Sequence, residues 1–476
     1  MPPNPIESTY DEKKQDYCET AEDSLDVDSA AERRLVRKLD LRLLPCLALT
    51  YLLAFLDVRP ISLRSVRRLV EGNARVAGLA TELHLGNWGF NIGTCLYYLI
   101  VCEIPAAMLV RKFGNRLVPL AVIAFGIITI GTGFIHNRSG FYAVKSLLGI
   151  AESFVLPGNS LFYRRSEFSV RIGFFIFSAG YLSGAFGGLL ASGFLRLFPI
   201  GPVHTWRHIF VWEGLITAGT GIFLFFLYPN RSETTTMLSE EERKLTALRV
   251  GGGVSGTKDG QFKHLSLAQV KEVVFNPIVL AATWFYIISE SVTGMSVFTP
   301  TILALNYPHA SPIRIQLLSV PPNVCAWALS LSLVYLAMRY KKHAAAALVG
   351  ALLTLAGYGT WLATDPTFIK TRYACLFLNT MGGSYGPIIL AWTISNARTD
   401  SAHALTAAMI SGTGAIGSIV GSWSYFPTDA KTGYHIGNTL NVSLAAVVTA
   451  GIAALWGFEF RYNKKKGSDS TFKYVL

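Results

Sequence analysis

The sequence predicts an all-α membrane protein with twelve transmembrane helices, and two observations carry that prediction. Of the 476 residues, 51% are hydrophobic and only 15% are charged, whereas about a quarter of the residues of a soluble domain are charged. The apolar residues also gather into blocks of roughly 17 to 25, each long enough to cross about 30 Å of hydrocarbon as a helix. We therefore expect a chain that crosses the lipid bilayer many times.

The predicted spans fall into two sets of six. The first set covers residues 41–57, 87–109, 117–135, 140–162, 169–194 and 207–228, and the second covers 276–299, 314–338, 344–363, 372–394, 404–424 and 438–460. The expected organisation is a disordered acidic cytosolic tail (1–32), an N-terminal six-helix bundle (33–228), a cytosolic linker (229–271), a C-terminal six-helix bundle (272–461) and a basic cytosolic tail (462–476). Two halves of similar length are typical of structural repeats that pack around a site at the membrane midplane.

Motifs and composition argue against several other classes of protein. Neither half contains G-x-x-x-x-G-K-[ST], the phosphate-binding loop of ATP-driven pumps, so we expect an ion gradient to supply any transport energy. The sequence shows no nucleophile–base pair, and its six cysteines lack the spacing of a metal site, so we expect no enzyme activity, no metal and no cofactor. The net charge of +12 lies mostly at predicted helix ends, which favours a lipid bilayer over nucleic acid as the partner.

The basic residues predict the orientation of the chain. With both termini in the cytosol, the cytosolic side gains Arg33, Arg34, Arg37, Lys38, Arg111, Lys112, Arg116, Arg164, Arg165, Arg339, Lys341, Lys342 and Lys464 to Lys466. The segment between the first two spans breaks this rule, because it carries arginines at positions 59, 64, 67, 68 and 75. We expect a monomer in the plasma membrane with both termini cytosolic.

One apolar stretch, residues 142–158, carries two charges at membrane depth. Lys145 and Glu152 are seven residues apart, which is about two helical turns, so both project from one face at a separation of roughly 10 Å. Charges at this depth are costly and usually face a bundle interior or a water-filled cavity. The alternative is a buried ion pair between packed helices.

Several strings in the chain are similar to those of a known family. They are ERRLVRKLDLRLLP (32–45), GNARVAGL (72–79), LLGIAES (147–153), YRRSE (163–167), WRHIFVWEG (206–214), LLSVPP (317–322) and YFPTDAKTGYHIG (425–437). In this order they resemble the fungal allantoate permease and nicotinic acid permease branch of the major facilitator superfamily, which are anion:cation symporters. The resemblance implies a major facilitator fold of two six-helix bundles. It also implies proton-coupled uptake of a small organic anion, such as a vitamin or a nitrogen source, by alternating access.

The resemblance assigns roles to residues of the N-terminal half. The related symporters have an Arg and a Glu on the fourth span for substrate binding and proton coupling, and here Lys145 and Glu152 occupy those positions. Lysine keeps the positive charge but lacks the planar fork of arginine. Asp57 and Glu103 match family positions, and we expect both to take part in proton coupling.

Three residues of the C-terminal half complete the predicted site. Glu290 is a carboxylate in the middle of the seventh span without a clear family counterpart, and we expect it to line the cavity and carry a proton. Asn379 and Tyr385 lie on the tenth span, which lines the central cavity of this superfamily, so the resemblance makes them candidate substrate contacts. Helix packing is the alternative explanation for each.

The segment 58–71, VRPISLRSVRRLVE, departs from the family pattern. The family has an Arg directly after the residue matched by Asp57, whereas this chain has about ten extra residues before Gly72 and Asn73. Either the sequence has diverged and Arg59 replaces the missing Arg, or the gene model retains an error such as an intron. This departure and Lys145 motivate a second hypothesis, a receptor-like protein or inactive paralogue that does not transport. A third is an anion channel or uniporter.

Overall fold

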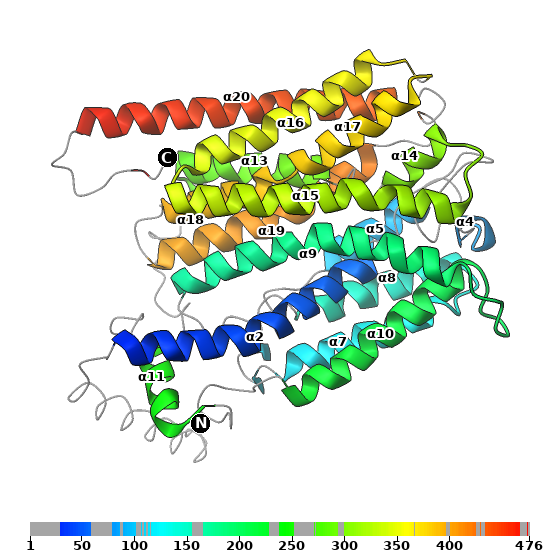
Figure 1. The fold of residues 1–476 in the computed structure, drawn as a ribbon, viewed down its shortest axis with the longest axis horizontal. Coiled ribbons are helices and arrows are strands. Elements are labelled where there is room, and N and C mark those ends of the chain that lie inside the picture. The colour runs from blue at the N-terminus through cyan, green and yellow to red at the C-terminus, as the bar shows by residue number, and fades with distance from the viewer. Residues whose placement is uncertain are drawn as a thin grey trace.

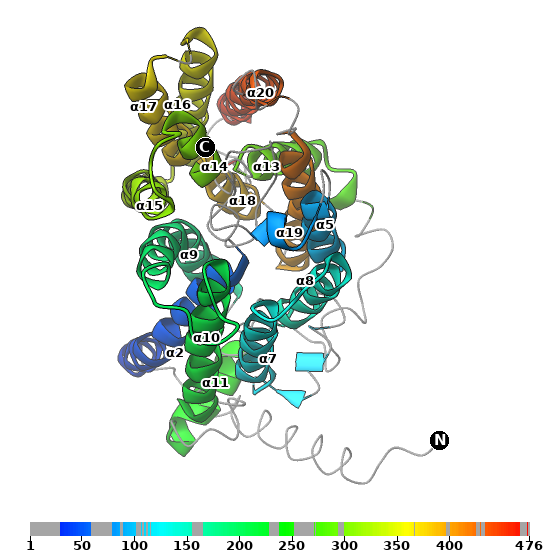
Figure 2. The same cartoon turned by 90° about the vertical axis from the view of Figure 1, so that its right-hand side faces the viewer.

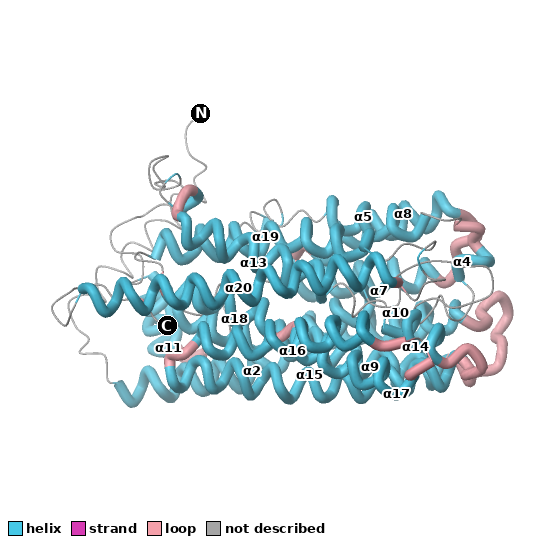
Figure 3. Tube along the Cα trace, turned by 90° about the horizontal axis from the view of Figure 1, so that it is seen from above, coloured by secondary structure: helices cyan, strands magenta, loops and turns pink. Residues whose placement is uncertain are grey.

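The fold of the chain is given by a computed structural model. It describes residues 29–58, 79–85, 89–100, 106, 109–110, 113–114, 116–154, 165–227, 238–251, 271, 273–293, 299–365, 367–396, 400–424, 429, 434–466 and 474. The secondary structure of these residues is helical apart from one bridge between Ile200 and Val203, as the tube in Figure 3 shows. The chain is therefore helical, as predicted.

Most of the helices run side by side along the length of the molecule (Figure 1). In the first half they are α2 (Ser29–Val58), α4 (Leu79–Glu82), α5 (Gly89–Ile100), α7 (Leu117–Thr132), α8 (Arg138–Glu152), α9 (Arg165–Phe194) and α10 (Trp206–Leu227). The linker carries α11 (Glu240–Gly251). The second half contains α13 (Pro277–Thr293), α14 (Thr299–Asn306), α15 (Pro312–Tyr340), α16 (His343–Ala363), α17 (Ile369–Gly382), α18 (Tyr385–Ser395), α19 (Asp400–Ser424) and α20 (His435–Lys466).

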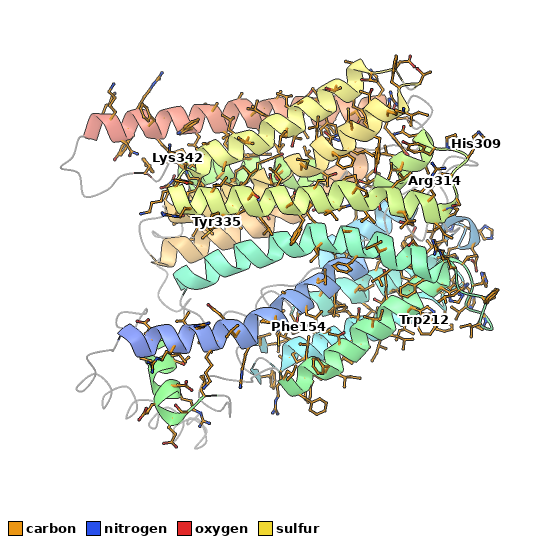
Figure 4. All side chains as sticks on the ribbon, viewed as in Figure 1. Phe154, Trp212, His309, Arg314, Tyr335 and Lys342 are labelled. Carbon is orange, nitrogen blue, oxygen red and sulfur yellow. The ribbon has the colours of Figure 1, made fainter. Side chains whose placement is uncertain are left out.

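Seen along the helices, the two halves form two neighbouring groups (Figure 2). They meet where α9 packs against α15 and where α5 packs against α19. We call the two ends of the molecule the α4 end, on the right of Figure 1, and the α11 end, on its left. Figure 4 places His309 and Arg314 at the α4 end and Lys342 at the α11 end.

Every predicted span coincides at least partly with helix, but several bounds differ. The predicted span 372–394 is divided into α17 and α18 by a turn at Gly383 and Ser384. Helix α20 extends to Lys466, into the predicted tail 462–476, and α2 begins at Ser29, inside the predicted tail 1–32. The short helices α4 and α14 were not expected. The extensions of α2 and α20 arise because helices continue past the hydrocarbon wherever polar residues still favour helix, so hydropathy alone does not fix their ends.

Five helical segments within the described residues are long and apolar enough to cross a membrane. They are 206–227, 312–340, 343–363, 369–395 and 435–465, and two shorter apolar helices cover 117–132 and 277–292. Each is a predicted span. Such helices satisfy their own backbone hydrogen bonds, which a segment surrounded by lipid must do.

The linker helix α11 is held to the start of α2. Its first turn forms a capping box, in which the Glu242 amide donates to Ser239 Oγ at 3.2 Å and the Ser239 amide donates to Glu242 Oε2 at 2.9 Å. Lys38 Nζ donates to the same Glu242 oxygen at 2.6 Å. This bond from Lys38 is the main reason that the pKa of Glu242 lies below its usual value.

Two residues have clear backbone roles at helix ends. Gly114 has a φ of +90°, a conformation that glycine adopts without strain, so the short turn before α7 forms there. Asp429 caps α20, because its Oδ2 accepts hydrogen bonds from the amides of Ile436 at 2.7 Å and Gly437 at 3.2 Å. That carboxylate accounts for one residue of the YFPTDAKTGYHIG string.

Candidate functional site

Helix α8 carries the two charges that the sequence predicts to form a site. The helix begins at a cap in which Asn137 Oδ1 accepts from the Gly140 amide at 2.8 Å. Lys145 lies in the middle of α8 and is only 3% exposed, whereas Glu152, in its last turn, is partly exposed. The sequence placed both residues on one helix face, and a single residue of a neighbouring helix contacts both.

That residue is Tyr97 of α5. The ammonium group of Lys145 lies 5.6 Å from the centre of the Tyr97 ring, and the Tyr97 hydroxyl donates a hydrogen bond to Glu152 Oε2. A cation over an aromatic ring that is shielded from water is stabilised by about 2 kcal/mol. Tyr97 therefore joins the cation and the carboxyl group into one cluster. The sequence did not predict a role for Tyr97.

Gly149 brings α5 and α8 close enough for these contacts. It lies between Lys145 and Glu152 on α8, and a Cβ atom there would be 2.6 Å from the backbone oxygen of Tyr97. Any larger residue would push the two helices apart. The sequence offered only a weak signal for Tyr97, namely a tyrosine among apolar residues of the second span.

Two of the predicted proton-coupling residues are not described at the level of their side chains. Asp57 lies in the last turn of α2, and its side chain is outside the described part of the structure. Glu103 and the segment 59–78, which holds the family departure, also lie outside the described residues. Their roles stay predictions.

A second polar group lies in the C-terminal half. The Glu290 carboxyl of α13 receives a hydrogen bond from Tyr286, one turn earlier on the same helix. Helix α19 packs tightly over this pair, since a Cβ on Gly414 would lie 3.3 Å from Glu290 Cγ and 2.8 Å from the Tyr286 ring. Tyr385 of α18 is completely buried and has the Glu290 carboxyl among its electrostatic neighbours. The structure thus brings together Glu290 and Tyr385, which the sequence proposed separately.

Asn379 is placed differently. It is buried on α17, and its side-chain oxygen packs directly against Gly357 of α16. Its position between two helices of the same half agrees with the packing explanation that the sequence left open. Contact with a substrate stays a prediction for this residue.

A third cluster, at the α4 end, was not expected from the sequence. Glu82 of α4 accepts a 2.6 Å hydrogen bond from Nε1 of Trp206 and bonds of 2.7 and 3.2 Å from the Arg207 guanidinium. The same guanidinium donates to the backbone oxygens of Gly133 at 2.5 Å and Ile135 at 3.2 Å. Arg207 thus connects α4, α10 and the turn between α7 and α8.

The charge of Glu82 is stabilised by these partners. Partial burial by itself raises the pKa of Glu82, but the hydrogen bonds from Arg207 and Trp206 outweigh it, so the pKa lies below its usual value. His204 Nε2 also lies 4.0 Å from Glu82. The tryptophan and arginine of the WRHIFVWEG string therefore have a structural explanation.

Within the described residues, no group of three His, Cys, Asp or Glu side chains is arranged to hold a metal ion. The clusters above offer instead a buried cation, carboxyl groups and aromatic hydroxyls. This chemistry suits recognition of an anion and exchange of protons.

Comparison with known proteins gives the family. The model of the Major Facilitator Superfamily matches residues 74–422. The chain is 29% identical over 450 residues to MFS transporter prlL of Fungal sp. (strain NRRL 50135), covering 91% of this chain and 88% of that protein. It is 28% identical over 299 residues to the high-affinity nicotinic acid transporter of Saccharomyces cerevisiae, covering 61% of this chain and 52% of that protein.

A solved structure shares the fold. A bacterial homologue of the human lysosomal transporter Spinster, in an inward-facing and unoccupied conformation, superposes with a TM-score of 0.62. The match covers 86% of this chain and 95% of that one at 14% sequence identity. This likeness shows a shared fold, and the family match together with the apolar helices shows a multi-pass membrane protein.

Proposed function

Because this chain belongs to the Major Facilitator Superfamily, we propose that it is a twelve-helix secondary transporter that couples proton entry to uptake of a small organic anion. The observation that carries this proposal is the cluster of Lys145, Tyr97 and Glu152. A buried cation can attract a carboxylate, and a carboxyl group linked to it can change protonation during the cycle.

In the proposed mechanism, the substrate carboxylate binds to Lys145 and draws the ammonium group away from the Tyr97 ring. Glu152 then takes up a proton on the outer side and releases it on the inner side as the two six-helix bundles change their relative tilt. Asp57, Glu103 and Glu290 are further candidates for carrying protons. Tyr385 and Asn379 are candidates for holding the remainder of the substrate.

The proposed setting follows from the charges at the helix ends. We assign the α11 end to the cytosol, because basic residues exposed there include Arg339, Lys341 and Lys342. Both termini would then be cytosolic, and the membrane would be the plasma membrane. The transporter would act as a monomer and without a cofactor.

Nicotinate is the first substrate to test. The yeast relative is a nicotinic acid transporter by name, and nicotinate presents the single carboxylate that one buried lysine can bind. Allantoate, a nitrogen-source anion, is the second. A panel of other small carboxylates would follow, since identity near 28% to that relative fixes the class of protein more firmly than its substrate.

Uptake of labelled nicotinate and of the panel into cells, with and without a proton uncoupler, tests the proposal. We expect uncoupler-sensitive uptake of at least one anion, and its loss in Glu152→Gln. Lys145→Met should raise the half-saturating concentration about tenfold to a hundredfold, because it removes a bond to a charged group. Lys145→Arg should retain tight binding, since arginine offers a fork suited to carboxylates.

The controls separate the alternatives. Glu241→Gln changes an exposed carboxyl group on α11 and should leave uptake unchanged. Uptake that survives both the uncoupler and Glu152→Gln would identify a channel or uniporter. A protein that reaches the membrane but takes up none of the panel would instead be receptor-like or inactive.

A further inference from the structure

A buried carboxyl group that the proposed transport site does not use lies near the α11 end. Glu459 of α20 is 0% exposed. Its Oε2 accepts a hydrogen bond of 3.2 Å from Nε1 of Trp392, and its Oε1 accepts one of 3.2 Å from Nδ2 of Asn396. Trp392 lies in α18 and Asn396 directly follows it, so this one side chain, which we call the Glu459 contact, joins α18 to α20.

Helix α18 is a separate segment of the tenth predicted span. Helix α17 ends at Gly382 and α18 begins at Tyr385. The backbone bonds that close the turn between them are long, 3.4 Å each from the amides of Gly383 and Ser384. An interrupted helix can change its tilt at the break more readily than a continuous one. The Glu459 contact holds the opposite end of α18, where it has the greatest control over that tilt.

The described surroundings of Glu459 supply no cation that pairs with it. Among the described residues, no basic nitrogen lies within 4.0 Å of its carboxyl oxygens. The helices packed against α20 are α13, α16 and α19, together with α18. Their described ionisable side chains are Tyr286 and Glu290 on α13, His343 and Tyr358 on α16 and Tyr385 on α18, while α20 itself carries His435, Arg461, Tyr462, Lys464 and Lys465.

Two of the tyrosines donate to other groups. Tyr286 donates to Glu290, and Tyr358 donates to the backbone oxygen of Val292. His343 is buried in the first turn of α16, at the α11 end. Burying an ionised carboxylate among neutral donors costs free energy. Glu459 therefore binds a proton more readily than a carboxyl group that is paired with a cation.

We propose that Glu459 is a proton-binding site at the α11 end, and that its protonation state sets how firmly α18 is held against α20. When the group is ionised, both oxygens accept charge-assisted bonds, which are about twice as strong as neutral ones. When it binds a proton, one of the two donors faces a hydroxyl group. If α18 moves away, the carboxyl group stays inside the helix bundle and loses both donors, so its ionised form is less stable there than in the contact. Proton binding therefore favours the separated arrangement and weakens the contact. Helix α18 also carries Tyr385, which neighbours Glu290. A movement of α18 that follows proton binding at Glu459 therefore also moves Tyr385 relative to the Glu290 carboxyl group.

Hydrogen–deuterium exchange of the full chain in lipid nanodiscs tests this directly, without a substrate. The measured quantity is the exchange rate of peptides covering 385–395 divided by that of peptides covering 369–382 in the same sample, which cancels the intrinsic effect of pH. We expect the ratio to rise about tenfold between pH 9 and pH 5 in the native protein as the Glu459 contact weakens. In Glu459→Gln the ratio should be high and independent of pH, because the amide offers one acceptor instead of two.

Two further variants keep the test decisive. Trp392→Phe retains the carboxyl group and removes one donor, so its ratio should be raised at every pH while the pH response is kept. Glu241→Gln, at an exposed site, should behave as the native protein. A ratio that stays flat with pH in the native protein, or a native pH response that survives in Glu459→Gln, overturns the proposal. Neither outcome depends on whether the protein transports an anion.

Discussion

Two carboxyl groups at opposite ends of the molecule each accept a hydrogen bond from a tryptophan indole, but their second hydrogen-bond donors differ. Glu82, at the α4 end, accepts from the indole of Trp206 at 2.6 Å, and Glu459, near the α11 end, accepts from the indole of Trp392 at 3.2 Å. The second donor is the guanidinium of Arg207 for Glu82 and the amide of Asn396 for Glu459. The Glu82 side chain is 35% exposed, whereas Glu459 is 0% exposed.

The second donor decides whether each carboxyl group stays ionised. A cation beside Glu82 stabilises its charge, so that group acts as a permanent link between elements. An amide beside Glu459 supplies a hydrogen bond but no charge, so the proton can bind and leave. The same residue type therefore gives a fixed structural connection at one end and, in our proposal, a proton-dependent one at the other.

The largest effect is expected from removing the cation of the Glu82 cluster. Arg207→Met leaves Glu82 and the backbone oxygens of Gly133 and Ile135 without their shared donor. We expect a loss of about 3 kcal/mol in the free energy of unfolding, measured by thermal unfolding in detergent. Arg196→Met removes an exposed arginine near the same end and should cost little. Equal unfolding temperatures for the two variants would contradict the structural role of Arg207.

A cation can also be added at the other end. Asn396→Lys would place an ammonium group near Glu459 and make this contact resemble the Glu82 cluster. We expect the exchange ratio of α18 to lose its roughly tenfold pH response and to stay low, because the carboxylate would remain ionised. Asn396→Gln provides the control, since it keeps an amide without adding charge. If the lysine variant keeps the pH response, the neutral surroundings of Glu459 are not its cause.

The smallest effect concerns acid stability at the α4 end. Because the pKa of Glu82 is lowered in the folded protein, its stabilising contribution is present above the pKa of the unfolded chain and is lost as the pH falls through the folded value. Between pH 7 and pH 4, the unfolding temperature of Glu82→Gln should therefore fall slightly less than that of the native protein. An equal or larger fall in the variant would show that Glu82 is not held in its ionised form.

The sequence predicted some parts of these sites and missed others for a common reason. Lys145 and Glu152 could be placed on one face because both lie on one helix, where spacing fixes direction. Tyr97 could not be connected to them, since it lies on another helix and nothing local relates α5 to α8. Glu459 was overlooked because it lies near the basic end of the last span, where a carboxyl group looks like an ordinary solvated residue.

By itself, the sequence determined that this chain is a bundle of membrane helices in two halves, with a charged face on the fourth predicted span. A continuous apolar run of about 20 residues crosses lipid as a helix, because a helix satisfies its backbone hydrogen bonds within the segment itself. Only the tertiary structure decided which carboxyl group meets a cation, which meets a tyrosine and which meets neutral donors. Those pairings depend on how helices far apart in the chain pack, and they set the charge that each buried group can carry.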